Sequence, residues 1–123
     1  MTVHSLFPTR VYTAKLQASG WEAFNGRLLR ECGIYRADDV AGRAWSKERY
    51  PAGYTSYGSL NRMHTLSPTF ASLGRKLRRH VLAYARELEY DLEGRELSLT
   101  DCWINMMPRG VTHGLHLHPL ATI

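Results

Sequence analysis

The chain has 123 residues, a length that suits one domain, because a domain closes its hydrophobic core with roughly 100–150 residues. Hydrophobic residues make up 44% of the sequence and charged residues 22%, close to the average of globular proteins. No segment approaches the roughly 20 consecutive apolar residues of a membrane-spanning helix, and residues 1–10 lack the order of a secretory signal. These features exclude a membrane-spanning protein and a disordered tail, and we expect a cytoplasmic protein without a membrane partner.

The net charge and the two cysteines do not specify a partner or a metal site. Lysine and arginine total 16 against 11 aspartate and glutamate residues, and the resulting net charge of +5 permits contact with polyanions without specifying it. Cys32 and Cys102 have no partner at the spacing of a disulfide framework or a zinc site. We therefore interpret both cysteines as small buried apolar residues.

The first third of the chain predicts an extended segment followed by a helix. Residues 3–16 are compatible with an edge strand. Ser19 and Glu22 then form a possible capping box, and Gly33 is expected to end the helix that follows over residues 21–32. The apolar face of this helix consists of Trp21, Phe24, Leu28, Leu29 and Cys32.

The middle of the chain predicts a long connection and a second helix. Residues 35–66 are rich in glycine and tyrosine, with a strand expected within residues 53–57. Ser67 and Pro68 then begin a helix, as a capping residue followed by proline at its tolerated first position. Its apolar face consists of Phe70, Leu73, Leu77, Val81, Tyr84 and Leu88.

The last third predicts two extended stretches laid against each other. Residues 97–107 alternate as a strand does, residues 108–110 have the chemistry of a turn, and residues 111–123 form the second stretch. The sequence ends in the apolar run 120–123 without a closing turn. We therefore expect either a fragment cut off after this strand or a domain that a partner completes, such as a second copy in a homodimer.

Three of the six histidines lie close together in the last stretch, at positions 113, 116 and 118. Residues two apart on a strand share a face, so His116 and His118 can present both imidazoles to one point. His113 is expected on the opposite face unless a bulge intervenes. Imidazole binds iron, zinc, copper and nickel, and a mononuclear non-haem iron site needs three protein ligands. The pair supplies two of them. The alternatives are an exposed polar strand face and hydrogen bonds to backbone carbonyls.

A longer motif surrounds this pair. A tryptophan, an asparagine, a glycine turn and a histidine pair followed by proline stand in a fixed order, as Trp103, Asn105, Gly110, His116, His118 and Pro119. The string resembles a segment of a prokaryotic and phage family of 2-oxoglutarate/Fe(II)-dependent oxygenases. Residues 6–9 (Leu-Phe-Pro-Thr) and 53–56 (Gly-Tyr-Thr-Ser) resemble two further segments of that family. The resemblance covers almost all of this chain, but only the first part of a family member.

The resemblance implies an α+β fold in which residues 1–123 are the amino-terminal portion of one oxygenase-like domain. That portion would belong to a double-stranded β-helix, a jelly-roll or cupin-like barrel, with two packing helices. The implied activity is a dioxygenase that uses Fe(II), with 2-oxoglutarate as co-substrate, to hydroxylate a C–H bond. His116 and His118 would be the catalytic metal ligands, and Asn105 would hydrogen-bond the co-substrate.

This sequence departs from the wider superfamily at one ligand. His118 stands where most members have an aspartate or glutamate, so the pair brings one negative charge fewer to the metal. The family's third ligand and the basic residue that holds 2-oxoglutarate belong to later strands. We therefore expect no turnover from these residues alone, and the substrate, a small molecule or a protein, is not specified.

Two other functions stay open. The basic run at residues 75–80 could hold a nucleic-acid backbone, which would make the chain a non-enzymatic binding module. Acidic residues follow at 87–93, so we favour a solvated helix face and do not expect nucleic acid as a partner. The second alternative is a cupin-like metal-binding domain without redox chemistry.

Overall fold

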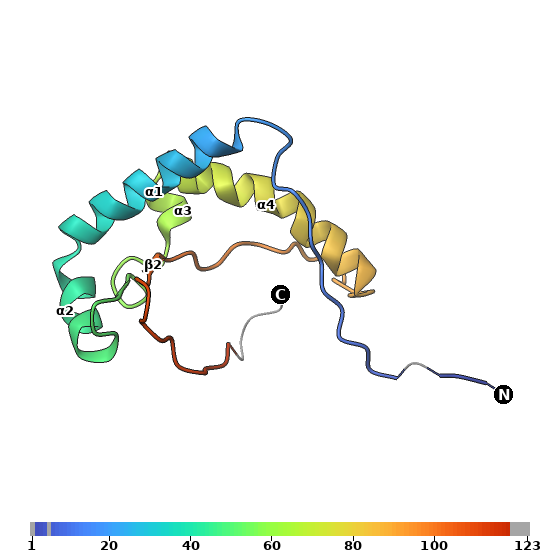
Figure 1. Ribbon diagram of the computed structural model, residues 1–123. Coiled ribbons are helices and arrows are strands. Elements are labelled where there is room, and N and C mark those ends of the chain that lie inside the picture. The colour runs from blue at the N-terminus through green and yellow to red at the C-terminus, as the bar shows by residue number, and fades with distance from the viewer. Residues whose placement is uncertain (1, 5, 119–123) are drawn as a thin grey trace.

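The computed structural model describes residues 2–4 and 6–118. The described residues form the helices α1 (Trp21–Asp38), α2 (Val40–Arg49), α3 (Met63–Leu66) and α4 (Pro68–Glu87), and the strands β1 (Tyr54–Thr55) and β2 (Asn105–Met106). The strands pair antiparallel, with Tyr54 opposite Met106 and Thr55 opposite Asn105. Figure 1 shows α1 and α4 together as an arch, with the strands and the segment after β2 on its concave side.

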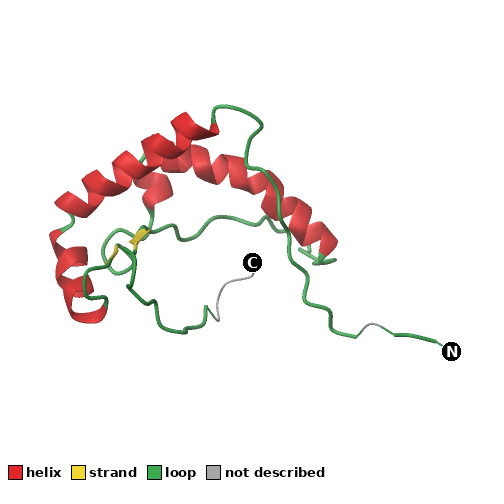
Figure 2. Cartoon of the chain, in the orientation of Figure 1, coloured by secondary structure: helices red, strands yellow, loops and turns green. Residues whose placement is uncertain are grey.

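The expected double-stranded β-helix is absent from the described residues, so that prediction is wrong. This part of the chain is mostly helical, as Figure 2 shows, and its one sheet has two strands of two residues each. The segments 6–16 and 111–118 are extended but form no ladder with another described segment. Their residue types favour an extended backbone, but a strand also needs a neighbour that accepts its N–H groups and donates to its carbonyls. The expected run 119–123 lies outside the described residues.

The amino-terminal segment lies against α4 through side chains, and not as an edge strand. Arg79 donates a hydrogen bond to the carbonyl of Leu16 (2.7 Å), and the Tyr84 hydroxyl donates to the carbonyl of Arg10 (2.7 Å). Tyr12 and His80 share a third contact, between the hydroxyl and Nδ1 (3.0 Å). Figure 1 shows this blue segment crossing α4 before it extends away from the arch.

The first helix is longer than the sequence predicts. α1 begins after Gly20, whose φ is 67°, and no side chain caps it, so the role expected of Ser19 is not observed. The helix then continues through Gly33 to residue 38, because a glycine in a helix costs only about 1 kcal/mol relative to alanine. Residues 40–49, expected within a long connection, form α2.

The start of α4 is confirmed. The Ser67 hydroxyl caps the helix by accepting hydrogen bonds from the backbone N–H groups of Thr69 (3.1 Å) and Phe70 (3.2 Å), and Pro68 occupies the first turn. The carboxylate of Glu31 accepts from the hydroxyls of Ser67 and Thr69. These contacts attach α1 to the beginning of α4.

The hydrophobic core is small and lies where α3, α4 and the strands meet. Its buried members are Tyr54, Met63, Phe70 and Ile104. Cys32 and Cys102 pack against it as half-buried free thiols, as their interpretation as apolar residues requires. Burial raises the pKa of both thiols, so they stay protonated at neutral pH.

A buried carboxylate connects the helices to β1. Asp39, 8% exposed, lies between α1 and α2 and accepts hydrogen bonds from the Gly42 backbone N–H (2.8 Å), the Tyr54 hydroxyl (2.8 Å) and the Ser59 hydroxyl. A Cβ at position 42 would lie 2.0 Å from Asp39 Oδ2, so only glycine fits there. Burial and this carboxylate raise the pKa of Tyr54, whose hydroxyl therefore remains a donor.

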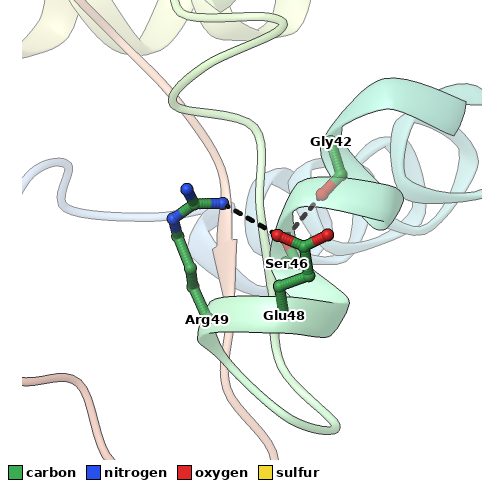
Figure 3. Close-up of polar contacts among 4 residues, drawn as sticks. All are labelled: Gly42, Ser46, Glu48 and Arg49. Carbon is green, nitrogen blue, oxygen red and sulfur yellow. Dashed lines mark hydrogen bonds and ion pairs between the residues drawn. The ribbon is translucent and has the colours of Figure 1, made fainter.

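Buried serines continue this polar framework. The Ser46 hydroxyl donates to the Gly42 carbonyl (2.7 Å), as Figure 3 shows, and accepts from the Thr55 N–H (2.9 Å). The ion pair of Arg49 with Glu48 in the same figure is exposed and therefore adds little stability. α2 is thus attached to β1 by a buried hydroxyl and not by surface charge.

We predict that Asp39→Asn lowers the free energy of unfolding at pH 7 by about 1–3 kcal/mol, because an amide nitrogen replaces the oxygen that accepts from the hydroxyls of Tyr54 and Ser59. Burial opposes ionisation of Asp39, but hydrogen bonds from Ser59, Gly42 and Tyr54 outweigh it and hold its pKa below the ordinary 3.8. Because folding lowers the pKa of Asp39, the ionised carboxylate stabilises the folded state above pH 3.8. This stabilisation is lost as the pH falls further.

Urea denaturation from pH 7 to pH 2, followed by circular dichroism, measures both effects. Asp39→Asn should show a shallower loss of stability in acid than the wild type. The control Asp38→Asn changes an exposed neighbour and should stay within about 0.5 kcal/mol of the wild type. Equal effects of the two substitutions would contradict the assignment of Asp39.

Candidate metal centre at the histidine pair

The histidines lie on the extended segment 111–118 that follows β2. A turn at Gly110, with φ of 87°, leads into it, and the segment passes close over Gly53. A Cβ at position 53 would lie 2.8 Å from Met107 Sδ and 3.2 Å from Val111 Cγ1. The glycine before β1 therefore lets the start of the histidine segment pack against the body of the protein.

The structure brings His116 and His118 together. Their Nε2 atoms are 3.0 Å apart, and the ring centroids are 4.8 Å apart with an interplanar angle of 79°. His116 Nδ1 donates to the Gly114 carbonyl (2.9 Å), since a carbonyl can only accept. In the neutral ring, Nε2 of His116 therefore carries a lone pair that is directed at its neighbour.

The separation of the two nitrogens fits one metal ion. Two nitrogen ligands that each lie about 2.1 Å from an ion, at right angles to each other, are about 3.0 Å apart. Ligands at the wider tetrahedral angle would be about 3.4 Å apart. The observed 3.0 Å between the Nε2 atoms is compatible with two neighbouring ligand positions on one ion, and it is also the length of the hydrogen bond that the two rings make without metal.

His113 does not lie on the opposite face, so that expectation is wrong. Its ring centroid is 4.6 Å from that of His116, and its Nε2 shares a hydrogen bond with the Tyr50 hydroxyl (2.9 Å). The segment is not a paired strand, and the alternation of side chains that a strand imposes does not apply. Tyr50, at the end of α2, is a contact that spacing along the sequence could not identify.

Trp103 supports the other end of the pair. Its ring centroid lies 5.7 Å from that of His118, and Tyr57 packs edge-on against the same indole with ring centroids 5.1 Å apart. Asn105, with its amide oriented to satisfy its surroundings, donates to Thr55 Oγ1 (2.6 Å) and accepts from Trp103 Nε1 (3.2 Å). The amide thereby fixes the indole beside His118, and co-substrate binding by Asn105 stays a prediction.

The aromatic contacts form one continuous series from α2 to the loop after β1. In order of contact, its rings are Trp45, Tyr50, His113, His116, His118, Trp103 and Tyr57. The histidine segment is therefore held at both ends by rings of the folded body. The two candidate ligands remain exposed, which leaves them accessible to an ion and to a substrate.

The described residues supply a pair of ligands and not a complete set. Among them, no group of three or more histidine, cysteine, aspartate or glutamate side chains is arranged to hold a metal ion. A hydrogen bond with the Tyr50 hydroxyl engages Nε2 of His113. His116 and His118 alone can therefore form a two-point site.

Comparison with protein-family models and with curated proteins finds no match to this chain. None of the helices in the described residues combines the length and the apolar character needed to cross a membrane.

We predict that Tyr50→Phe loosens the histidine segment, because it removes the hydroxyl that holds His113. ¹⁵N relaxation should show lower heteronuclear NOE values for residues 112–114, and stability should fall by about 0.5–1.5 kcal/mol. Tyr35→Phe is the matched control, since its hydroxyl bonds to the Leu66 carbonyl at the other side of the core. Unchanged NOE values in Tyr50→Phe would show that this hydrogen bond does not hold the segment.

Proposed function

We propose that the chain supplies two ligands, His116 and His118, to the ferrous centre of a 2-oxoglutarate-dependent dioxygenase. The observation that carries this proposal is the 3.0 Å separation of the two Nε2 atoms. The ordered motif from Trp103 to the histidine pair supports it, through its resemblance to the oxygenase family. The proposal concerns the site and its chemistry and does not depend on a β-helix.

Different contacts hold the two imidazole rings. The hydrogen bond from His116 Nδ1 to the Gly114 carbonyl fixes the ring orientation and leaves Nε2 for the metal. Histidines that bind metals usually donate their other ring N–H to an acceptor in this way. The Trp103 ring limits the rotation of His118. Bound iron and 2-oxoglutarate would supply the oxidation of a substrate C–H bond by dioxygen.

The ligand pair favours an anionic co-substrate. Both imidazoles bind metals in the neutral form, so they leave the double positive charge of a ferrous ion uncompensated. A dicarboxylate that binds the ion therefore gains more electrostatic stabilisation here than beside a protein carboxylate. A histidine at position 118 is therefore compatible with 2-oxoglutarate as co-substrate.

A cytoplasmic location is part of this proposal. Cys32 and Cys102 are both free thiols, as expected in a reducing compartment, and such a compartment also keeps iron ferrous. The alternative function is metal binding without redox chemistry. It uses the same histidine pair and differs only in whether 2-oxoglutarate binds.

We predict that His116→Ala and His118→Ala each weaken Fe(II) binding at least tenfold, because each removes one of two ligands that act on the same ion. Anaerobic isothermal titration calorimetry measures the affinity. His4→Ala is the control, since this exposed histidine lies on the amino-terminal segment. Wild-type affinity in either of the first two variants would remove that residue from the site.

We also predict that the iron-loaded chain retains 2-oxoglutarate in anaerobic equilibrium dialysis. The iron-free chain and the His116→Ala variant should retain it at least tenfold less. Succinate is the matched control ligand, because it lacks the keto oxygen next to a carboxylate that lets 2-oxoglutarate hold iron at two points. Iron binding with no preference for 2-oxoglutarate over succinate would support the metal-binding alternative and contradict the oxygenase.

A further inference from the structure

A basic hollow of about 510 Å³ lies between α4 and residues 16–18, and it shares no residue with the histidine pair. Its charged lining consists of Arg75, Lys76 and Arg79. Spacings of three and four residues place Arg75 and Arg79 on one face of α4, with Lys76 beside them. The side chain of Arg79 is fixed there by its bond to the Leu16 carbonyl (2.7 Å).

The three cations are not neutralised by the described carboxylates. The ion pairs among the described residues join Arg49 to Glu48, Arg78 to Glu96 and Arg95 to Glu93. Arg78 belongs to the same basic run but is directed to Glu96, so the structure separates it from its neighbours. Three like charges in one hollow repel one another, and an anion with several charged oxygens would relieve this repulsion.

A second hollow of about 490 Å³ adjoins the first, because residues 16–18 line both. Its lining is largely aromatic and aliphatic, with Trp21, Phe24 and Leu28, and the polar side chains of Lys15 and Asn25. Trp21 is 58% exposed and offers a free ring surface. Lys76 lies over the ring of Phe24, with Nζ 5.5 Å from its centroid, and marks the boundary between the two hollows.

We propose that the two hollows bind a nucleotide unit, with phosphate on the cations of α4 and the base against Trp21. Phosphate is the anion that three clustered cations favour, and a flat base stacks on an exposed indole irrespective of sequence. Polar groups of the second hollow can contact the base edge, and both volumes lie within the roughly 300–1,000 Å³ of small-molecule sites. The basic run alone indicates only a solvated helix face, and the adjoining aromatic hollow is the additional observation.

Fluorescence anisotropy with a labelled 12-nucleotide single-stranded oligonucleotide tests the proposal on the whole chain. Three phosphate contacts predict that log affinity falls with log salt at a slope of about −2 for a single strand. Arg75→Gln and Lys76→Gln should each reduce the steepness of the slope by about 0.7. Arg95→Gln removes the same charge from an exposed ion pair and should leave the slope unchanged.

The contribution of the base is tested at Trp21. Trp21→Ala should lower the affinity for the oligonucleotide at least fivefold. Trp21→Phe should retain most of the affinity, because a smaller ring still stacks. Circular dichroism verifies that each variant is folded. Inorganic tripolyphosphate serves as a probe without a base, and its affinity should not change in Trp21→Ala.

Competition by AMP distinguishes a free nucleotide from a nucleic-acid strand as the ligand. AMP that competes at micromolar concentration indicates a free nucleotide, whereas competition by the oligonucleotide alone indicates a nucleic-acid strand, and either result supports the proposal. Absence of oligonucleotide and AMP binding at 50 mM salt would overturn it. Equal binding by the wild type, Lys76→Gln and Trp21→Ala would also overturn it, since contact would then occur elsewhere on this basic protein.

Discussion

The position of the histidine segment depends on the buried carboxylate of Asp39. This side chain caps α2 through Gly42 and accepts the hydroxyls of Tyr54 and Ser59, so it connects the α1–α2 junction to β1 and to the loop after β1. Tyr50, at the end of α2, contacts the histidine segment from one side. β2, held by β1, leads into the same segment from the other side. One carboxylate thus sets the relative position of both supports.

Buried hydroxyls perform much of the positioning that apolar packing performs in larger domains. The Ser56 hydroxyl accepts from the Ile104 N–H (3.0 Å) and donates to the Leu60 carbonyl (2.9 Å), which continues the contact of β1 with the second strand beyond their two paired residues. Ser46 attaches α2 to the same strand. A buried hydroxyl is stable only when it is paired, so each contact specifies one arrangement of its neighbours. The Gly-Tyr-Thr-Ser segment therefore acts as a structural junction.

Local signals in the sequence were sufficient for some elements. The capping chemistry of Ser67 and Pro68 identified the start of α4, and the β-favouring run around residue 54 identified β1. The sequence could not show that Gly33 lies inside a helix, because tertiary contacts decide whether that small cost is tolerated. Nor could it show His113 beside His116, since the prediction assumed the alternation of a paired strand. The candidate ligands were identifiable by type and spacing, but the contact of Tyr50 with His113 joins distant parts of the chain, and the contact of Trp103 with His118 depends on the path of the segment between them.

The contact between the two imidazoles is a hydrogen bond in which one nitrogen donates and the other accepts. In the protein alone, Nε2 of His116 accepts, because its Nδ1 carries the proton that bonds Gly114, and Nε2 of His118 must donate. A metal ion held by both nitrogens at a right angle would lie off the line between them, and its binding would remove this proton from Nε2 of His118. His118 then needs only to carry its proton on Nδ1, a change of tautomer within one ring. Binding an ion would therefore move one proton within His118 and leave both rings neutral, so the full charge of the ion would remain for an anionic ligand to balance.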